Sequence, residues 1–183
     1  MKKPENPTKS RERKPKSLRV GENKKFTVMI NWINTKFGLS LSESDLSNVK
    51  DFSLIWSIFD RHVCNSGFSI TRIEQKYSNM KFDSKEMEFF FDYFKRRYIN
   101  DIGITNSLFD KLRLRRNDRP QFVQDVMLGK ITDLNSKVLA ITIIIYRYRN
   151  NFFHGLKDYS TIDKQDKNFE VANEFLKTII NKF

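Results

Sequence analysis

The chain has 183 residues, which suits one domain with a hydrophobic core, and its single cysteine, Cys64, excludes an internal disulfide framework. Scarce Gly (6) and Pro (4) beside abundant Phe (17) favour long helices over a many-stranded sandwich. The net charge of +12 favours a polyanionic partner. The sequence has no paired cysteines, histidine cluster, Gly-rich phosphate loop or G-x-S-x-G elbow, so we expect no metal site and no cofactor.

The first residues are strongly basic, with ten Lys and Arg against three acids in positions 1–25. Because residues 1–20 carry three prolines and almost nothing apolar, we predict a flexible basic arm there, followed by one helical domain over 21–183. The arm suits non-specific attraction to phosphates, and a solvated tail without a dedicated partner is an equally open interpretation. No apolar stretch resembles a signal peptide, and the run 138–145 is too short for a membrane span. We therefore expect a cytoplasmic protein without membrane contact.

Apolar residues recur at three- and four-residue spacing along most of the remaining chain, which is typical of amphipathic helices. The helical segments that this pattern predicts are 22–37, 46–64, 82–99, 104–114, 120–128, 133–153 and 165–180. The β-branched run 141–145 would also suit a strand, but its segment is too long for one and its flanks are helical in pattern. The sequence thus predicts an all-α bundle of about five to seven helices, with residues 133–153 as its buried centre.

Polar residues close this most apolar helix. Asn150 and His154 are four positions apart and share one helical face, and Tyr146 extends that stripe by one turn. Arg149 lies beside the stripe, so that an amide, an imidazole and a guanidinium converge where an apolar helix reaches solvent. Arg and His also suit the negative end of a helix dipole, and the spacing alone leaves both interpretations open.

The run Arg149-Asn150-Asn151-Phe152-Phe153-His154-Gly155 closely resembles the R-N-x-x-x-H signature of the HEPN (higher eukaryotes and prokaryotes nucleotide-binding) superfamily. The glycine after the histidine resembles the Apea-like and related branches in particular. Leu156 stands where the HEPN toxins paired with minimal nucleotidyltransferases carry a tyrosine, which departs from that branch. The sharp match covers these seven residues, and the layout of a late apolar helix followed by a final amphipathic one is compatible with it.

The resemblance implies a metal-independent endoribonuclease that works as a homodimer. His154 would be the general acid or base at the ribose 2′-hydroxyl or the leaving 5′-oxygen. Arg149 would hold the scissile phosphate, and Asn150 would orient His154 or donate to a phosphate oxygen. The working protein would be a toxin or a phage-defence effector, and an antitoxin or a sensor protein is a further partner to consider.

RNA is the partner that this chemistry requires, because DNA lacks the 2′-hydroxyl nucleophile. The residues that we predict to bind the substrate are Tyr146, Arg147, Asn151, Arg115 and Arg116. Tyr146 and Tyr148 suit stacking on bases or packing, whereas Phe152 and Phe153 favour packing. The four arginines of the 113–119 region, Arg113, Arg115, Arg116 and Arg119, also suit solvated helix ends.

Two other functions stay open from the sequence. In the first, the motif binds RNA or a protein partner without catalysis. In the second, the chain is a basic helical DNA-binding protein, which ranks last because no convincing helix-turn-helix pattern is present.

Overall fold

The computed structural model describes residues 21–153 and 165–183, with side chains from residue 28 onward. The predicted arm at 1–20 and the predicted catalytic His154 lie outside the described residues. The chain divides into two compact units, residues 1–40 and 41–183. The helix that begins at residue 21 lies in the first unit, and the other described helices lie in the second.

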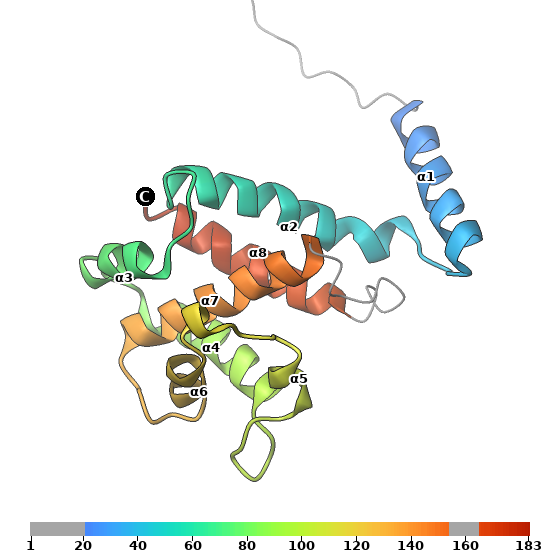
Figure 1. The fold of residues 1–183 in the computed structure, drawn as a ribbon. Helices are drawn as coiled ribbons and strands as arrows, with labels where there is room; N and C mark the ends of the chain where they lie inside the picture. Colours follow the sequence, from blue (N-terminus) through green and yellow to red (C-terminus); the bar gives the residue numbers. More distant parts are fainter. Residues whose placement is uncertain (1–20, 154–164) are drawn as a thin grey trace, which may run out of the picture. The chain divides into compact units, whose positions relative to one another are not determined.

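The described residues are all-α, as the sequence predicted, with eight α-helices and one short 3₁₀ helix (Figure 1). The elements are α1 (Gly21–Phe37), α2 (Glu43–His62), α3 (Ile70–Ser78), α4 (Ser84–Tyr98), α5 (Ser107–Asp110), η1 (Arg116–Asp118), α6 (Pro120–Met127), α7 (Leu134–Phe153) and α8 (Asp166–Ile180). In the N-terminal unit, α1 ends before Gly38, whose positive φ of 65° terminates the helix.

Local capping residues account for where several helices begin. The Ser42 hydroxyl and the Asp45 carboxylate form a reciprocal capping box at the start of α2. The Asp83 carboxylate accepts the Glu86 N–H at 2.7 Å to open α4, and Pro120 begins α6, as predicted. These side chains satisfy backbone donors that each helix leaves without an internal partner.

Two sequence predictions for helices were wrong. The predicted helix at 104–114 is only the four-residue α5, because residues 99–105 turn back on themselves and Arg113 adopts a left-handed backbone (φ 51°). The sequence prediction also missed α3, although its Ser69 cap and its buried Ile73 and Tyr77 are helical signals.

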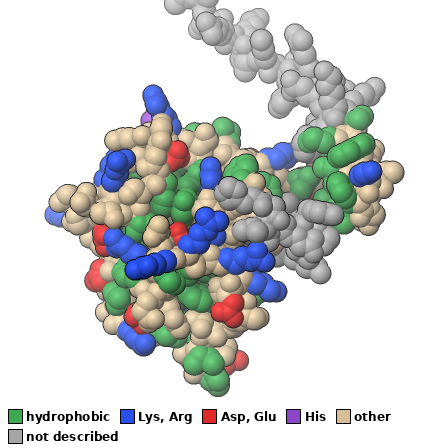
Figure 2. All heavy atoms as spheres, viewed as in Figure 1, with side chains coloured by type: hydrophobic (Ala, Val, Ile, Leu, Met, Phe, Trp, Pro, Cys, Tyr) green, Lys and Arg blue, Asp and Glu red, His purple; other side chains and the backbone are tan. Residues whose placement is uncertain are grey.

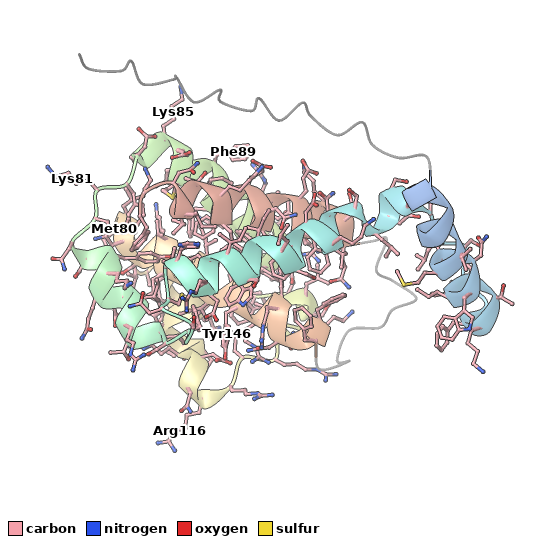
Figure 3. The ribbon with its side chains drawn as sticks, turned by 90° about the horizontal axis from the view of Figure 1, so that it is seen from above. Met80, Lys81, Lys85, Phe89, Arg116 and Tyr146 are labelled. Atoms are coloured by element: carbon pink, nitrogen blue, oxygen red, sulfur yellow. The ribbon has the colours of Figure 1, made fainter. Side chains whose placement is uncertain are left out.

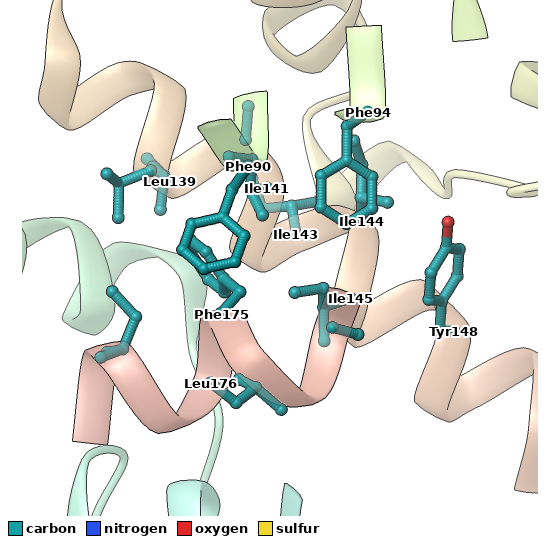
Figure 4. Close-up of a cluster of buried hydrophobic side chains, with 14 of the residues drawn as sticks. Phe90, Phe94, Leu139, Ile141, Ile143, Ile144, Ile145, Tyr148, Phe175 and Leu176 are labelled. Atoms are coloured by element: carbon teal, nitrogen blue, oxygen red, sulfur yellow. The ribbon is translucent and has the colours of Figure 1, made fainter. Parts of the chain in front are cut away.

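Helix α7 is the centre of the second unit, with every residue from 138 to 145 buried. Helices α3, α4 and α6 pack directly on α7, whereas α2 runs beside α8 (Figure 1). Figure 4 shows rings of α4 and α8, among them Phe90 and Phe175, against the isoleucines of α7. A helix buried on all sides needs apolar residues around its whole circumference, and the β-branched run 141–145 supplies them.

Candidate functional site

The predicted motif lies in the last turn of α7, the most thoroughly buried helix of the bundle. Its described part runs from Arg149 to Phe153, and His154 follows directly outside the described residues. Because residues 138–145 anchor the helix in the core, the position of this last turn is set by packing on several neighbouring helices. The site therefore begins on a rigid element.

Arg149 is half-buried and its guanidinium is oriented by two neighbours. Its Nη1 donates to the Asn150 side-chain oxygen at 2.9 Å, and its guanidinium carbon lies 5.4 Å from the centre of the Phe153 ring. The Nε of Arg149 is buried and has no hydrogen-bond acceptor among the described residues. An arginine held in this way keeps an unused N–H donor, from which an anionic group could accept a hydrogen bond.

Arg147, two positions earlier, is 1% exposed and faces the protein interior. Its Nη1 lies 3.2 Å from the Asp118 carboxylate, and its Nε donates to the Leu112 carbonyl at 3.2 Å. Burial lowers the pKa of Arg147 from its ordinary value, and the negative charge of Asp118 opposes that shift. The predicted role of Arg147 in substrate binding needs an accessible side chain, and the structure instead gives Arg147 a place in the core.

Asn151 belongs to the same buried network. Its side-chain oxygen accepts from Arg147 Nη2 at 3.1 Å, and its side-chain nitrogen donates to the carbonyls of Lys111 and Leu112 at 3.3 and 3.0 Å. With 3% of its surface exposed, Asn151 is as inaccessible to a ligand as Arg147. The structure corrects both predicted substrate contacts for one reason. Arg147 and Asn151 are buried, and their side chains bind residues 111–118 to α7.

Residues 111–118 also carry Arg115 and Arg116, the other two arginines that we predicted to bind the substrate. Asp118 accepts the Arg115 backbone N–H at 2.7 Å and so closes the short η1 turn. Arg115 and Arg116 are exposed, as are Lys111 and Arg113. Figure 2 shows Lys and Arg side chains gathered on this face of the molecule. We call the exposed cations Lys111, Arg113, Arg115 and Arg116 the basic segment. Arg119 differs, because it pairs with Glu74 at 2.8 Å.

Tyr146 is half-buried on another side of α7 and forms the wall of a cavity. Its ring stacks on Phe68 with 4.2 Å between ring centres, and its centre lies 5.9 Å from that of Trp56. The cavity has a volume of about 170 Å³ and is lined by Trp56, Asp60, Phe68, Tyr146 and Arg149. The structure therefore brings two predicted site residues, Tyr146 and Arg149, to the same cavity.

Asp60 is a charged lining residue that the sequence did not indicate. It lies near the end of α2, and among the described residues its carboxylate has no hydrogen bond or ion pair. Nothing in the local sequence marks it, because its place at the cavity depends on how α2, α7 and the connection at residue 68 come together. An acidic acceptor and an arginine thus line the same hollow.

Tyr148, which suited either stacking or packing, is a core residue. It is 3% exposed, and its hydroxyl lies 2.5 Å from the hydroxyl of Tyr98. Burial raises the pKa of Tyr148 and raises that of Tyr98 to about 12. Phe152 contacts the rings of Phe153 and Phe169, in agreement with packing.

No group of three or more His, Cys, Asp or Glu side chains in the described part of the chain is placed to hold a metal ion. Among the described helices, none combines the length and the apolar character that a membrane span requires. No protein-family model matches the chain, and comparison with curated proteins and with solved structures finds no match either.

Proposed function

We propose that the chain is a metal-independent endoribonuclease of the HEPN type, with Arg149 and His154 as its catalytic residues. Asn150, which is 5% exposed, is the residue that orients Arg149. The observation that carries the proposal is the state of Arg149. Its guanidinium is oriented by Asn150 and Phe153, retains an unused buried donor, and borders a cavity at the end of an anchored helix. The basic segment, locked beside the same helix, supplies cations for an RNA backbone.

The proposed reaction is an internal transfer on the RNA backbone. A base takes the proton of the ribose 2′-hydroxyl, the 2′-oxygen attacks the neighbouring phosphorus, and the bond from phosphorus to the 5′-oxygen breaks as an acid protonates that oxygen. The products are a 2′,3′-cyclic phosphate and a 5′-hydroxyl. An imidazole titrates at about pH 6.5, so His154 suits either proton transfer, while Arg149 offsets charge on the phosphate.

Each chain supplies one histidine and one arginine through this motif. Simultaneous acid and base catalysis uses two such groups, which a two-fold symmetric dimer provides without a second motif in the chain. We therefore include a homodimer in the proposal, with the last turns of two α7 helices contributing to one site.

The direct test incubates the purified full chain with a structured RNA in the presence of EDTA. We expect cleavage to persist in EDTA and to be lost in His154→Ala and Arg149→Ala. Arg149→Lys should remain strongly impaired, because an ammonium cannot reproduce the planar fork of donors. Cleavage that disappears with EDTA, or that survives in His154→Ala, would contradict the proposal.

A matched control is Lys85→Ala, which removes one cation as Arg149→Ala does. Lys85 is exposed near the start of α4 and lies well apart from Tyr146 in Figure 3. Because it takes no part in the proposed site, its removal should leave the rate of cleavage within about twofold of that of the natural chain. Circular dichroism of each variant checks that the fold is intact.

The same experiment addresses the non-catalytic alternative, since RNA that is bound but never cut would support a binding module. In cells, a toxin or defence effector should arrest growth when expressed, and His154→Ala should relieve that arrest. An antitoxin or sensor partner would then be sought among proteins that restore growth with the natural chain.

A further inference from the structure

The cavity beside Arg149 has the composition of a pocket for one flat, hydrogen-bonding ring. It lies where α2 and α7 meet Phe68, in the connection between α2 and α3, and measures about 170 Å³. Three of its lining residues are aromatic and the other two are charged, with opposite signs. Small-ligand pockets commonly combine such apolar walls with a few polar groups that fix orientation.

The aromatic wall is a connected cluster. Tyr146 stacks on Phe68 with an interplanar angle of 21°, and Trp56 has its ring centre 5.6 Å from that of Phe68 and 5.9 Å from that of Tyr146. Trp56 is 5% exposed, so it is fixed in the core while still bordering the cavity. Proteins that bind unpaired bases use such side chains as stacking surfaces.

The two charged groups determine which hydrogen-bonding groups the ligand must carry. Asp60 and Arg149 both line the cavity, yet no ion pair joins them within residues 28–153 and 165–183. An ionised carboxylate only accepts hydrogen bonds, and a guanidinium only donates them. A ligand that satisfies both groups therefore presents donors on one edge and an acceptor or an anion toward Arg149.

Among the four RNA bases, guanine meets this requirement best. Its Watson–Crick edge places two neighbouring donors, N1–H and the N2 amino group, where one carboxylate can accept both. Adenine, cytosine and uracil each present a single donor group next to at least one acceptor, which a carboxylate would repel. The phosphate attached to the guanosine would lie toward Arg149 and away from Asp60, because two anions in one small cavity repel each other.

We propose that this cavity binds an unpaired guanine base of the RNA substrate, with Asp60 as the residue that determines specificity. The inference rests on the proposed function, since it places the base next to the phosphate that Arg149 holds. Asp60 accepts the two donors of the guanine edge, and Trp56, Phe68 and Tyr146 form the apolar wall. Cleavage then occurs beside unpaired guanosines.

Ligand binding tests this pocket independently of cleavage. The full chain carries two tryptophans, Trp32 and Trp56, and Trp32→Phe leaves Trp56 as the only fluorescent reporter. Trp32 is 61% exposed on α1, so its replacement should be tolerated. We expect GMP to change the fluorescence of Trp56 at lower concentration than AMP, CMP or UMP. Inosine monophosphate, which lacks the N2 amino group, should bind more weakly than GMP.

In the same background, Asp60→Asn should weaken GMP binding by about tenfold or more, because the amide places a donor against the donors of guanine. Asp51→Asn is the matched control, since Asp51 is an exposed carboxylate on the same helix and does not line the cavity. It should leave GMP binding unchanged. Equal binding of GMP and AMP, or unchanged binding in Asp60→Asn, would overturn the proposal.

Mapping the cleavage sites of the natural chain on a single-stranded RNA separates the two proposals. Cuts that cluster beside guanosines support both. Cuts without any base preference, together with no GMP binding, reject the pocket and leave the nuclease intact. Intact RNA together with preferential GMP binding rejects the nuclease and keeps the guanine pocket.

Discussion

Arg147 Nη1 lies 3.2 Å from the Asp118 carboxylate, and both side chains are buried, with 1% and 7% of their surfaces exposed. The pair joins α7 to the end of η1, and the same guanidinium also binds the Leu112 carbonyl and Asn151. One buried cation thus fixes the basic segment beside the last turn of α7.

Removing either partner of this pair should strongly destabilise the fold. Asp118→Ala leaves Arg147 buried without its counter-charge, for which we expect a loss of about 3–5 kcal/mol in the free energy of unfolding. The double variant Asp118→Leu with Arg147→Met removes both charges and should recover much of that loss. Urea unfolding monitored by circular dichroism measures each value. A double variant no more stable than Asp118→Ala would show that the pair is not the source of the effect.

Alkaline pH should destabilise the protein through its buried tyrosines. In the folded state the pKa of Tyr98 is about 12, against about 10 for an exposed tyrosine, because burial disfavours the phenolate. The raised pKa stabilises the fold fully below pH 10, and this contribution is lost as the pH rises from 10 to 12. For Tyr98 it amounts to about 2–3 kcal/mol. Urea unfolding at a series of pH values checks this, with Tyr98→Phe expected to show a smaller decline.

Salt should weaken RNA binding through the basic segment. The double variant Arg115→Ala with Arg116→Ala removes two exposed cations, so the slope of log affinity against log salt should become shallower by about 1.5 to 2. Filter binding at several salt concentrations gives this slope. The control is Lys81→Ala with Lys85→Ala, two exposed lysines that lie apart from Tyr146 in Figure 3, and its slope should change by less than half as much.

If two chains share one active site, cleavage should depend on dimer formation. Specific activity should then rise with protein concentration and level off where sedimentation shows a dimer. The matched comparison is GMP binding per chain. The proposed guanine pocket is lined by residues of one chain, so GMP binding should not vary with protein concentration. Specific activity that stays constant while the chain is monomeric would exclude the shared site.

The buried centre of the fold could be predicted because a long apolar run with helical flanks has no stable alternative to a buried helix. Whether a single arginine points into the core or toward solvent could not be predicted from the sequence. Arg147 and Arg149 are two residues apart and therefore point about 200° apart around the helix. The sequence alone does not say which of them enters the core, since the deciding partner, Asp118, lies in the short helix η1, 29 positions earlier.

Only part of the candidate site could be predicted from the sequence. The spacing placed Arg149, Asn150 and Tyr146 on the last turns of one helix, and α7 includes all three. Asp60 and Phe68 could not be found, because they reach the cavity only through the packing of α2 and the following connection against α7. Predictions from spacing succeed within one helix and fail where separate elements meet.

The ion pair between Arg147 and Asp118 also bears on how this protein can diversify. A change at position 118 alone leaves a buried cation unpaired, and a change at position 147 alone leaves a buried carboxylate unpaired. Either single substitution would lower the stability of the fold, so we expect the two positions to covary among homologues of this chain. The exposed Arg113, Arg115 and Arg116 carry no such penalty. These positions can therefore vary while the buried pair keeps their segment attached to α7.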